Sequence, residues 1–415
     1  MKHFWGTMAV SLFLMTLMAN AQTPNTGWYT ANPGAASFNI STADQLAGLA
    51  QLVNNGNDFS GKTITLKNSI NLHNYKNWAP IGNGSAVFSG VFNGRGFVVN
   101  NLSIDRDASE QGLFGYVHKG QIENLGVVNA NIKGRGAVGI IAGRIFHSSV
   151  VNCYSSGMVT GNANDVGGLL GHAGSSVFVT KCRSYVTVSG AAYVGGLVGG
   201  IDYGGVISEC YSTGTVTGTG WNVGGIVSHI SRSRLTKSYS SAAVTGTTLV
   251  GGLVADVLQN GVLEYCTALN PAVKGENRVG RVAGNLSVST GGVLSNNTAY
   301  SKMKNSAGNA NWINKGADNL DGADVSIAPT DAEWTMGRGS KSASAHFVSA
   351  AGGTLHFRFS DRGKVDIYTL NGAKLRSLDF AQGDHSHRLN DLPLGMYIVN
   401  AVSGSRNHSL RVAVK

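Results

Sequence analysis

The chain has 415 residues, of which 58 are glycine, 6 are proline, 42% are hydrophobic and only 13% are charged. The hydrophobic share argues against a disordered chain, and the glycine share favours many turns joined by short strands. The formal net charge of +10 would attract acidic polysaccharide or lipopolysaccharide if it were clustered, and would serve only solubility if it were scattered.

The first residues predict a secretory signal peptide over 1–21. A short basic start precedes an almost wholly apolar stretch at 8–19, and Ala19-Asn20-Ala21 is a small-x-small cleavage site. We expect cleavage between Ala21 and Gln22, and no lipid anchor, because no cysteine lies near the site. No later stretch approaches the roughly 18 to 20 apolar residues of a membrane span. We therefore expect an exported chain with no transmembrane segment after cleavage and no nucleic-acid partner.

Residues 22–108 are expected to hold an N-terminal cap and the first coils of a repeat. Within them, 41–56 predicts a short amphipathic helix with Thr42 as its N-cap and Gln45 three residues later, the spacing of a capping box. Its apolar face would consist of Leu46, Leu49 and Val53. Such a helix would cover the unpaired strand edges of the first coil.

Residues 109–305 repeat one pattern, seen as "YVGGLVGG" at 193–200. Its valine recurs in steps of 28, 28, 29, 27 and 29 residues, at Val138, Val166, Val194, Val223, Val250 and Val279. The recurrence excludes a phosphate-binding loop, which needs one glycine-rich turn before a helix. Each unit has room for two or three short strands, so the units must stack to bury a face.

An all-β parallel β-helix of about seven coils, each of about 28 residues, satisfies this pattern. Each coil would add about 4.8 Å, and each column would become a ladder of like residues. Glycine is expected to provide sharp corners with positive φ between the strands. A second column in the same register reads Ile122, Val150, Val179, Ile207, Leu235, Leu263 and Leu294.

The cysteines follow the same register. Cys153, Cys182 and Cys210 fall on consecutive coils, and Cys266 lies two coils further on. At about 9.6 Å, the last pair would be beyond disulfide reach. We expect buried free thiols that act as small apolar residues, and a disulfide between neighbouring coils is the alternative.

The stretch "NWAPIGNGSAVFSGVFNGRGFVVNNLSI" at 77–104, followed by "GLFGYV" and the "VGGLVGG" units, resembles GLUG-motif repeat proteins of bacterial surfaces. The resemblance covers about 25–305. It implies a right-handed parallel β-helix of the kind found in adhesin-like proteins and beside protease domains. It transfers no catalytic residue to this chain.

Residues 306–345 are expected to cap the last coil, with Trp312 and Trp334 packed over it, and then to form a linker. Residues 346–415 alternate apolar and polar positions in about seven short segments, which predicts a small β-sandwich. Asn371-Gly372 is a two-residue hairpin signal within it.

This C-terminal part resembles the sorting domain of type IX secretion substrates, through "VDIYTLNGAKL", "LPLGMYIV" and a terminal "RVAVK". The resemblance implies outer-membrane export, often with removal of the tail and attachment to surface lipopolysaccharide. A sandwich module retained in the mature protein is the alternative. The matching positions are Tyr368, Asn371, Gly372, Leu392, Pro393, Gly395, Tyr397 and Lys415.

Charged residues give little sign of catalysis. Glu123 and Glu264 share a column but would lie five coils, or about 24 Å, apart, which exceeds the spacing of a glycosidase pair. The adjoining column predicts a surface ladder of Lys181, Glu209 and Lys237.

Histidines offer one further possibility. His229 and Asp256 are predicted to be neighbours at one corner, and His172 would lie two coils from His229. A metal or acid–base site could be built from such residues, although polar residues at exposed turns are ordinary. No metal-ligand cluster of recognisable spacing is present, and no cofactor is expected.

The best candidate ligand-binding residues form an aromatic column on consecutive coils: Tyr154, Arg183, Tyr211 and Tyr239. If these side chains point outward, Arg183 lies between two rings within cation–π reach. Such a ribbon could stack against sugar rings or an acidic glycan. The alternative is a packing ladder that stiffens the sheet.

These patterns favour an adhesin-like or structural repeat protein, secreted or at the outer-membrane surface of a Gram-negative bacterium, that binds glycan or host or matrix ligands without catalysis. Export and surface-attachment machinery would act on 346–415. The alternative is a polysaccharide-acting lyase or hydrolase, since such enzymes share the architecture. Acidic or basic side chains that meet across two or three coils would favour the enzyme, and flat coils without inserted loops favour the binder.

Overall fold

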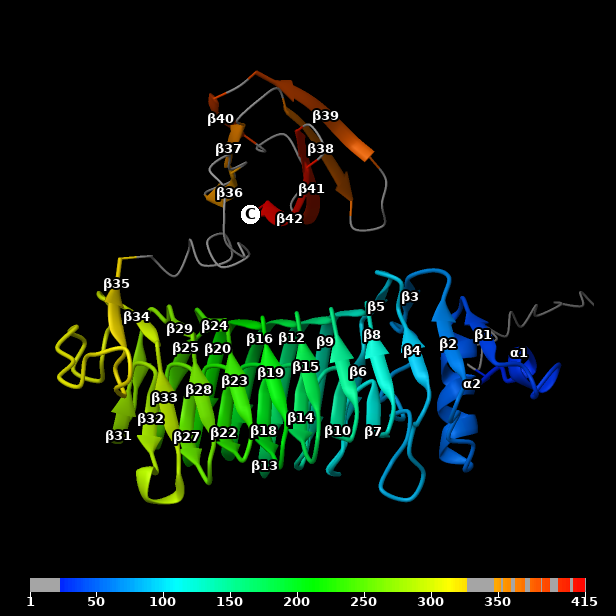
Figure 1. The fold of residues 1–415 in the computed structure, drawn as a ribbon. Coiled ribbons are helices and arrows are strands. Elements are labelled where there is room, and N and C mark those ends of the chain that lie inside the picture. Colours follow the sequence, from blue (N-terminus) through cyan, green and yellow to red (C-terminus); the bar gives the residue numbers. More distant parts are fainter. Residues whose placement is uncertain are drawn as a thin grey trace, which may run out of the picture.

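The computed structural model describes residues 23–326 and the segments 347–351, 354–359, 363–369, 374–381, 383–388, 395–403 and 406–414. Residues 23–326 form a parallel β-solenoid whose coils stack side by side in a row (Figure 1). The predicted cleavage site between Ala21 and Gln22 lies outside the described residues. Among the described residues, none of the helices is both long and apolar enough to span a membrane.

One face is a ten-stranded parallel sheet, which we call sheet A. Its strands, in spatial order, are β1 (Ser37–Ile40), β2 (Thr63–Leu66), β4 (Val91–Asn93), β8 (Gln121–Glu123), β11 (Ser149–Val151), β15 (Phe178–Thr180), β19 (Val206–Ser208), β23 (Arg234–Thr236), β28 (Val262–Glu264) and β33 (Val293–Ser295). The predicted parallel β-helix is confirmed, with about ten coils rather than seven. The three additional coils contribute β1, β2 and β4, which precede the glycine repeat and so escape its periodicity.

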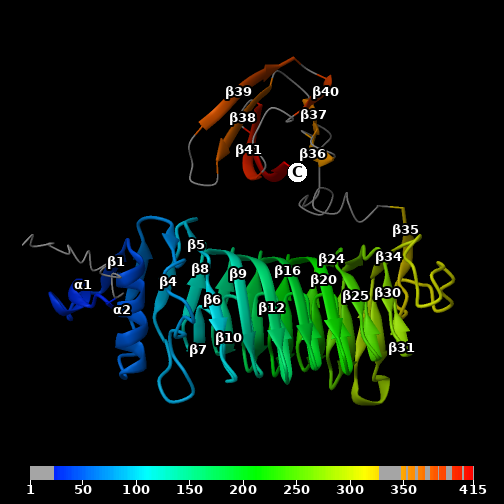
Figure 2. The ribbon, with the colours of Figure 1, turned by 180° about the vertical axis from the view of Figure 1, so that it is seen from behind.

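The second face, sheet B, has thirteen strands. Its main path is β3 (Ile70–Asn71), β5 (Val98–Asn100), β9 (Gly126–Gly134), β12 (Tyr154–Gly161), β16 (Arg183–Gly190), β20 (Tyr211–Gly218), β24 (Tyr239–Ser240), β29 (Thr267–Ala268), β34 (Thr298–Tyr300) and β35 (Ala323–Val325), and β6 (Ser103–Asp105), β25 (Ala243–Thr245) and β30 (Val273–Lys274) pair beside it. Figure 2 shows these strands from behind, ordered along the same row.

Two shorter parallel sheets lie in the coils from β7 onward. Sheet C consists of β7 (Phe114–His118), β10 (Ala142–Phe146), β14 (Leu170–Ala173), β18 (Val198–Asp202), β22 (Val227–Ser231), β27 (Val254–Leu258) and β32 (Ala283–Leu286). Sheet D consists of β13 (Asn164–Gly167), β17 (Ala192–Gly195), β21 (Trp221–Gly224), β26 (Thr248–Gly251) and β31 (Asn277–Gly280).

The core is a stack of like residues. The inward-facing residues of the sheet A strands alternate with outward-facing ones, and each is at most 6% exposed, as Phe92, Ile122 and Leu294 show. The register places Ile122 beside Val150 and Val150 beside Val179, as the column predicted. Stacking thus buries a continuous apolar face that no single coil could bury.

The repeated glycines do not have the role predicted for them. Gly195, Gly196 and Gly225 have no positive φ, so they do not form left-handed corners. They are instead packed against backbone: a Cβ on Gly225 would fall 1.9 Å from the carbonyl oxygen of Gly252 on the next coil. The left-handed corners are occupied by larger residues such as Asn152 (φ 51°) and Lys181 (φ 56°).

The four cysteines, Cys153, Cys182, Cys210 and Cys266, are free and buried, which confirms the prediction. Neighbouring coils meet at this column, where the Cys182 amide donates to the Cys210 Sγ atom at 3.4 Å. Burial raises the pKa of the Cys266 thiol to about 12. The Cys266 thiol therefore stays protonated, and all four cysteines pack as small core residues.

A helix closes the N-terminal end of the solenoid. The short helix α1 (Gly27–Thr30) precedes it, and α2 (Ala43–Asn54) buries Leu46, Leu49 and Val53 as predicted. The Gln45 amide donates to Thr42 Oγ1 at 3.2 Å. The Gln45 side chain accepts from the Ser41 amide at 2.8 Å, one residue earlier than a standard capping box.

A buried arginine closes the C-terminal end of the solenoid, and a 3₁₀ turn at Val288–Thr290 follows it in the chain. Arg281 is fully buried and donates to the carbonyls of Tyr300 (3.2 Å) and Gly322 (3.0 Å) and to Asp324 Oδ1 (2.6 Å). Trp312 packs against the core and donates from Nε1 to the Met303 carbonyl, as its predicted capping role requires. Trp334 lies outside the described residues.

The C-terminal strands form two small antiparallel sheets. They are β36 (Phe347–Ala351), β37 (Thr354–Phe359) and β40 (Gly383–Arg388) in one, and β39 (Lys374–Phe380), β38 (Gly363–Thr369), β41 (Gly395–Ser403) and β42 (Arg406–Val414) in the other. Strands β38 and β39, which flank Asn371-Gly372, pair antiparallel. Of the sorting-domain positions, Tyr368 lies in β38 and Gly395 and Tyr397 lie in β41. The others fall outside the described residues: Asn371, Gly372, Leu392, Pro393 and Lys415.

Candidate functional site

The predicted aromatic column lies on sheet B in the expected register. Tyr154 is paired with Arg183, Arg183 with Tyr211, and Tyr211 with Tyr239. The following residue of each strand is a serine that is fully buried, as at Ser184. Because side chains alternate, the column itself points away from the core.

The rings of this column pack closely on one another. Tyr211 and Tyr239 are stacked with centroids 4.4 Å apart, and Tyr185 meets Tyr211 edge-on at 5.7 Å. Tyr211 is only 4% exposed, whereas Tyr154 and Tyr239 are half-buried and Arg183 is exposed. Tyr211 therefore supports its neighbours, and Tyr154, Arg183 and Tyr239 present the surface of the column.

A second polar cluster lies on the outer face of sheet C. His229 Nε2 is 3.3 Å from Asp202 Oδ1, and His172 Nε2 is 4.0 Å from Asp202 Oδ2. Asp165 lies 3.5 Å from the other nitrogen of His172, and Ser228 Oγ lies 2.8 Å from the other nitrogen of His229. Side chains from consecutive coils thus converge on one carboxylate.

His229 and Asp256 are neighbours as predicted, but their place in the fold differs from the prediction. The two are register partners on β22 and β27 in a sheet face, not at a corner, and Asp256 accepts a hydrogen bond from Asn285 instead. The residue that sequence reasoning missed is Asp202. It stands two positions after Gly200 in β18, and the two-residue period of a strand was the signal that could have placed it on the same face.

The chemistry available to this cluster is limited by its burial. Ser228 is fully buried, so its hydroxyl positions His229 and is not placed to attack a substrate. Within residues 23–326 and the described C-terminal strands, no group of three or more His, Cys, Asp or Glu side chains is arranged to hold a metal ion. The cluster is a network of hydrogen bonds and ion pairs across coils.

The charged columns predicted from the sequence lie apart from the polar cluster of sheet C. Lys181, Glu209 and Lys237 all occupy left-handed corners and are exposed, and among the described residues no ion pair within 4.0 Å joins them. Glu123 and Glu264 stand on β8 and β28, five strands apart in sheet A.

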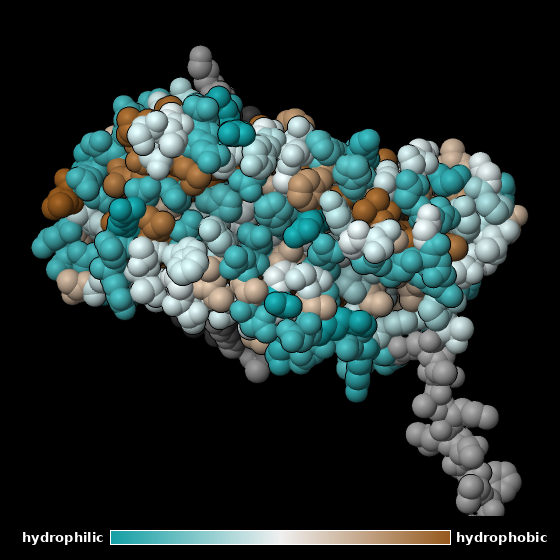
Figure 3. Space-filling view, turned by 90° about the horizontal axis from the view of Figure 1, so that it is seen from below, coloured by the Kyte–Doolittle hydropathy of each residue, from teal (hydrophilic) through white to brown (hydrophobic). Residues whose placement is uncertain are grey.

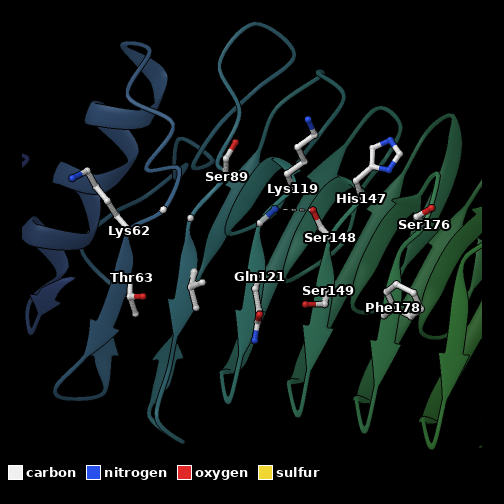
Figure 4. Close-up of a pocket in the computed structure, with 14 residues that line it drawn as sticks. Lys62, Thr63, Ser89, Lys119, Gln121, His147, Ser148, Ser149, Ser176 and Phe178 are labelled. Atoms are coloured by element: carbon white, nitrogen blue, oxygen red, sulfur yellow. Dashed lines mark hydrogen bonds between the residues drawn. The ribbon is translucent and has the colours of Figure 1, made fainter. Parts of the chain in front are cut away.

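A groove of about 410 Å³ lies where sheet C turns into sheet A, and sequence reasoning did not single it out. The corners before five consecutive strands of sheet A line it. Figure 4 shows Lys119 and His147 on neighbouring coils, with their side chains directed outward from the corner. The lining residues are Gly61, Lys62, Thr63, Ser89, Gly90, Val91, Lys119, Gly120, Gln121, His147, Ser148, Ser149, Ser176 and Phe178.

Exposed apolar side chains are spread over several faces. They include Phe178 on sheet A, Met158 on sheet B and Trp221 on sheet D. Seen from below, the surface is largely hydrophilic or neutral, with hydrophobic residues in separate patches (Figure 3).

Comparison with known proteins agrees with this architecture. Residues 190–217 match the GLUG motif. The chain is a β-solenoid that carries this motif, and the matched stretch runs from the end of β16 to β20, through one complete coil.

Two relatives extend the comparison. Halomucin of Haloquadratum walsbyi is 38% identical over 103 residues, which are 24% of this chain and 1% of halomucin, so this chain spans only a small part of that relative. A solved structure from Bacteroides ovatus, provisionally named an immunoglobulin A1 protease, has a TM-score of 0.52 at 22% identity. That match covers 70% of this chain and 84% of the Bacteroides chain, and at this identity the similarity shows the fold alone.

Proposed function

We propose that this chain is exported to the surface of a Gram-negative bacterium, where the solenoid binds glycan or matrix ligands without catalysis. The observation that carries the proposal is the aromatic column of sheet B. Its stacked Tyr211 and Tyr239 hold a rigid platform, and Arg183 stands exposed in the same column. Aromatic faces beside a guanidinium suit the apolar faces and the acidic groups of sugars.

The termini supply the rest of the proposal. Residues 1–21 have the pattern of a signal peptide, and 346–415 resemble a sorting domain that directs export and surface attachment. The GLUG motif and the flat, regular coils agree with a display scaffold.

A binding screen tests this proposal. The full-length chain is applied to arrays of neutral and acidic glycans and to extracellular-matrix proteins, beside the variant Arg183→Ala/Tyr239→Ala. The double variant is expected to lose binding to whichever class of glycan or matrix protein the unaltered chain binds. It removes the accessible guanidinium of Arg183 and the accessible ring of Tyr239, and it leaves the buried Tyr211 in place. Trp221→Ala, which removes an exposed aromatic ring on sheet D, should bind like the unaltered chain.

A second candidate function rests on the convergence of His172, Asp202 and His229 across coils. Such a meeting of acids and bases favours a polysaccharide-acting enzyme, in which an imidazole would move a proton. Release of new chain ends from polysaccharides, abolished by Asp202→Asn, would support this alternative over the binding function.

A further inference from the structure

A column of left-handed residues marks the corner between sheets C and A, which we call the basic corner. Five consecutive coils place one residue each there, with φ between 47° and 56°. These residues are Lys119, His147, Ser176, Tyr203 and Arg232. Each amide donates to a carbonyl of the next coil, as Lys119 does to Phe146 (3.1 Å) and Arg232 to Gln259 (2.8 Å), so the five side chains leave the solenoid in one line.

Within the part of the chain that the structure describes, no ion pair neutralises the charges of the basic corner. All five residues are exposed, and among the described residues no carboxylate lies within 4.0 Å of Lys119, His147 or Arg232. The nearby Lys62 is different, because its amine donates to the carbonyls of Pro33 and Ala35, both at 2.9 Å.

The groove beside the corner adds hydrogen-bonding and apolar groups. Its lining contains serine and threonine hydroxyls and the Gln121 amide, and it contains no Asp or Glu. Phe178 is half exposed at one end of it. Beyond Phe178, Arg232 lies over the ring of Tyr203 at 5.2 Å, which fixes a cation against an exposed aromatic face.

The local field of the corner is positive. His118 and His147 meet edge-on with ring centroids 5.6 Å apart. Burial lowers the pKa of His118, and the positive charges of Lys119 and His147 lower it further. An anion placed here would relieve this repulsion.

We propose that the basic corner and its groove bind an anionic polysaccharide that carries sulfate or carboxylate groups along an extended chain. The inference rests on the proposed binding function and names a ligand class for a different face of the same solenoid. From Lys119 to Arg232 the corner covers four coil spacings, or about 19 Å, which suits a linear polymer better than a single sugar. Cations stand at both ends of this line, and hydroxyls and aromatic rings lie between them.

The test compares dextran sulfate with unsulfated dextran of the same length on the full-length chain, by biolayer interferometry. The test variant is Lys119→Gln/His147→Asn/Arg232→Gln, in which asparagine suits the left-handed backbone of position 147. The control variant is Lys181→Gln/Lys237→Gln, which removes two lysines from exposed left-handed corners elsewhere. Both variants lose two formal positive charges from lysine and arginine, so a general effect of those charges would be equal in the two, and the test variant also removes the imidazole of His147.

The expected result is that only dextran sulfate binds, that the test variant binds about tenfold more weakly, and that the control stays within about twofold. Raising the salt concentration should weaken binding of the unaltered chain, because the contacts are exposed. Equal binding to both dextrans, or an equal loss in both variants, would overturn the proposal. Circular dichroism and thermal melting of each variant establish that it is folded.

The result also separates this inference from the proposed function. If a neutral glycan binds through Arg183 and Tyr239 while dextran sulfate does not bind, the basic corner is excluded and the binding function stands. If dextran sulfate binds through the basic corner, and Arg183→Ala/Tyr239→Ala binds it as tightly as the unaltered chain does, the ligand surface is the corner and not the aromatic column. If nothing binds to a folded chain, both proposals fall.

Discussion

The imidazole ring of His229 lies over Gly200 of the preceding coil, where a Cβ atom would fall 2.4 Å from His229 Cε1. Gly200 thus leaves the space in which the His229 ring approaches Asp202, with Nε2 3.3 Å from Oδ1. A glycine in a column that elsewhere holds Arg144 and His172 is therefore part of the polar cluster on sheet C.

Gly200→Ala is expected to displace His229 and to disturb the fold little. The new methyl group would meet the end of the flexible His229 side chain, which can move away, so the free energy of unfolding should change by less than about 1 kcal/mol. Urea denaturation measures that change, and the nitrogen-15 shifts of the His229 ring report its separation from Asp202. Unchanged histidine shifts would contradict the proposed packing.

Gly225→Ala is the matched contrast. The new Cβ atom would lie 1.9 Å from the backbone oxygen of Gly252, and the backbone cannot rotate away as a side chain can. We expect a loss of at least about 3 kcal/mol or a failure to fold. Equal destabilisation by the two alanine substitutions would show that the motif glycines are not distinguished by coil-to-coil contact.

Arg281→Ala is expected to destabilise the C-terminal end of the solenoid by about 2 to 4 kcal/mol, because it leaves a cavity and the unpaired carbonyls of Tyr300 and Gly322. Arg281→Met fills more of the volume and should cost less. Hydrogen exchange should show the loss of protection beginning at β31, β32 and β35 and fading toward β8. Uniform loss along the whole solenoid would contradict a local capping role.

Asp324 makes this end sensitive to acid. Burial raises its pKa, but hydrogen bonds from Arg281 and Lys315 outweigh burial, so that the pKa lies below its usual value. A folded pKa below the unfolded one means that the carboxylate stabilises the fold above the unfolded pKa, and that this contribution is lost as pH falls through the folded pKa. The melting temperatures of the unaltered chain and Asp324→Asn should therefore differ most above the ordinary aspartate pKa of about 3.9 and converge as the pH falls through the lower pKa of the folded state. A constant difference across this range would contradict the ion pair.

The cysteine column predicts thiols that do not react in the folded state. Burial of all four thiols, with the pKa of Cys266 raised to about 12, leaves almost no accessible thiolate at neutral pH. A thiol reagent should modify none of them in buffer and all four in denaturant. Modification of the folded chain, or a disulfide found by mass spectrometry, would contradict this prediction.

The columns of the fold were visible in the sequence because stacked coils repeat the same environment. The inward position of each sheet A strand must be apolar, so Ile122, Val150 and Val179 reveal both period and register. The coils around Phe38, Ile64 and Phe92 were harder to count, since their corners lack the glycine motif although the same face is buried.

Contacts between neighbouring columns were not predictable in the same way. Asp202 contacts His229 only because Gly200 has no side chain. The contact thus depends on three residues from two coils. The basic corner was missed because its residues have little in common except a left-handed backbone, which no residue type among Lys119, Tyr203 and Arg232 signals. Such sites depend on the lateral order of columns, and a repeat period gives only the order along each column.

The central claim, a solenoid that binds saccharide without transforming it, is tested most directly by measuring binding and turnover together. The full-length chain is incubated with neutral and sulfated polysaccharides, and both the bound fraction and the release of new chain ends are followed. Our account predicts saturable binding that Arg183→Ala/Tyr239→Ala or the basic-corner variant weakens, with no new chain ends. New chain ends that disappear with Asp202→Asn would contradict it and would identify the His172–Asp202–His229 cluster as an active site.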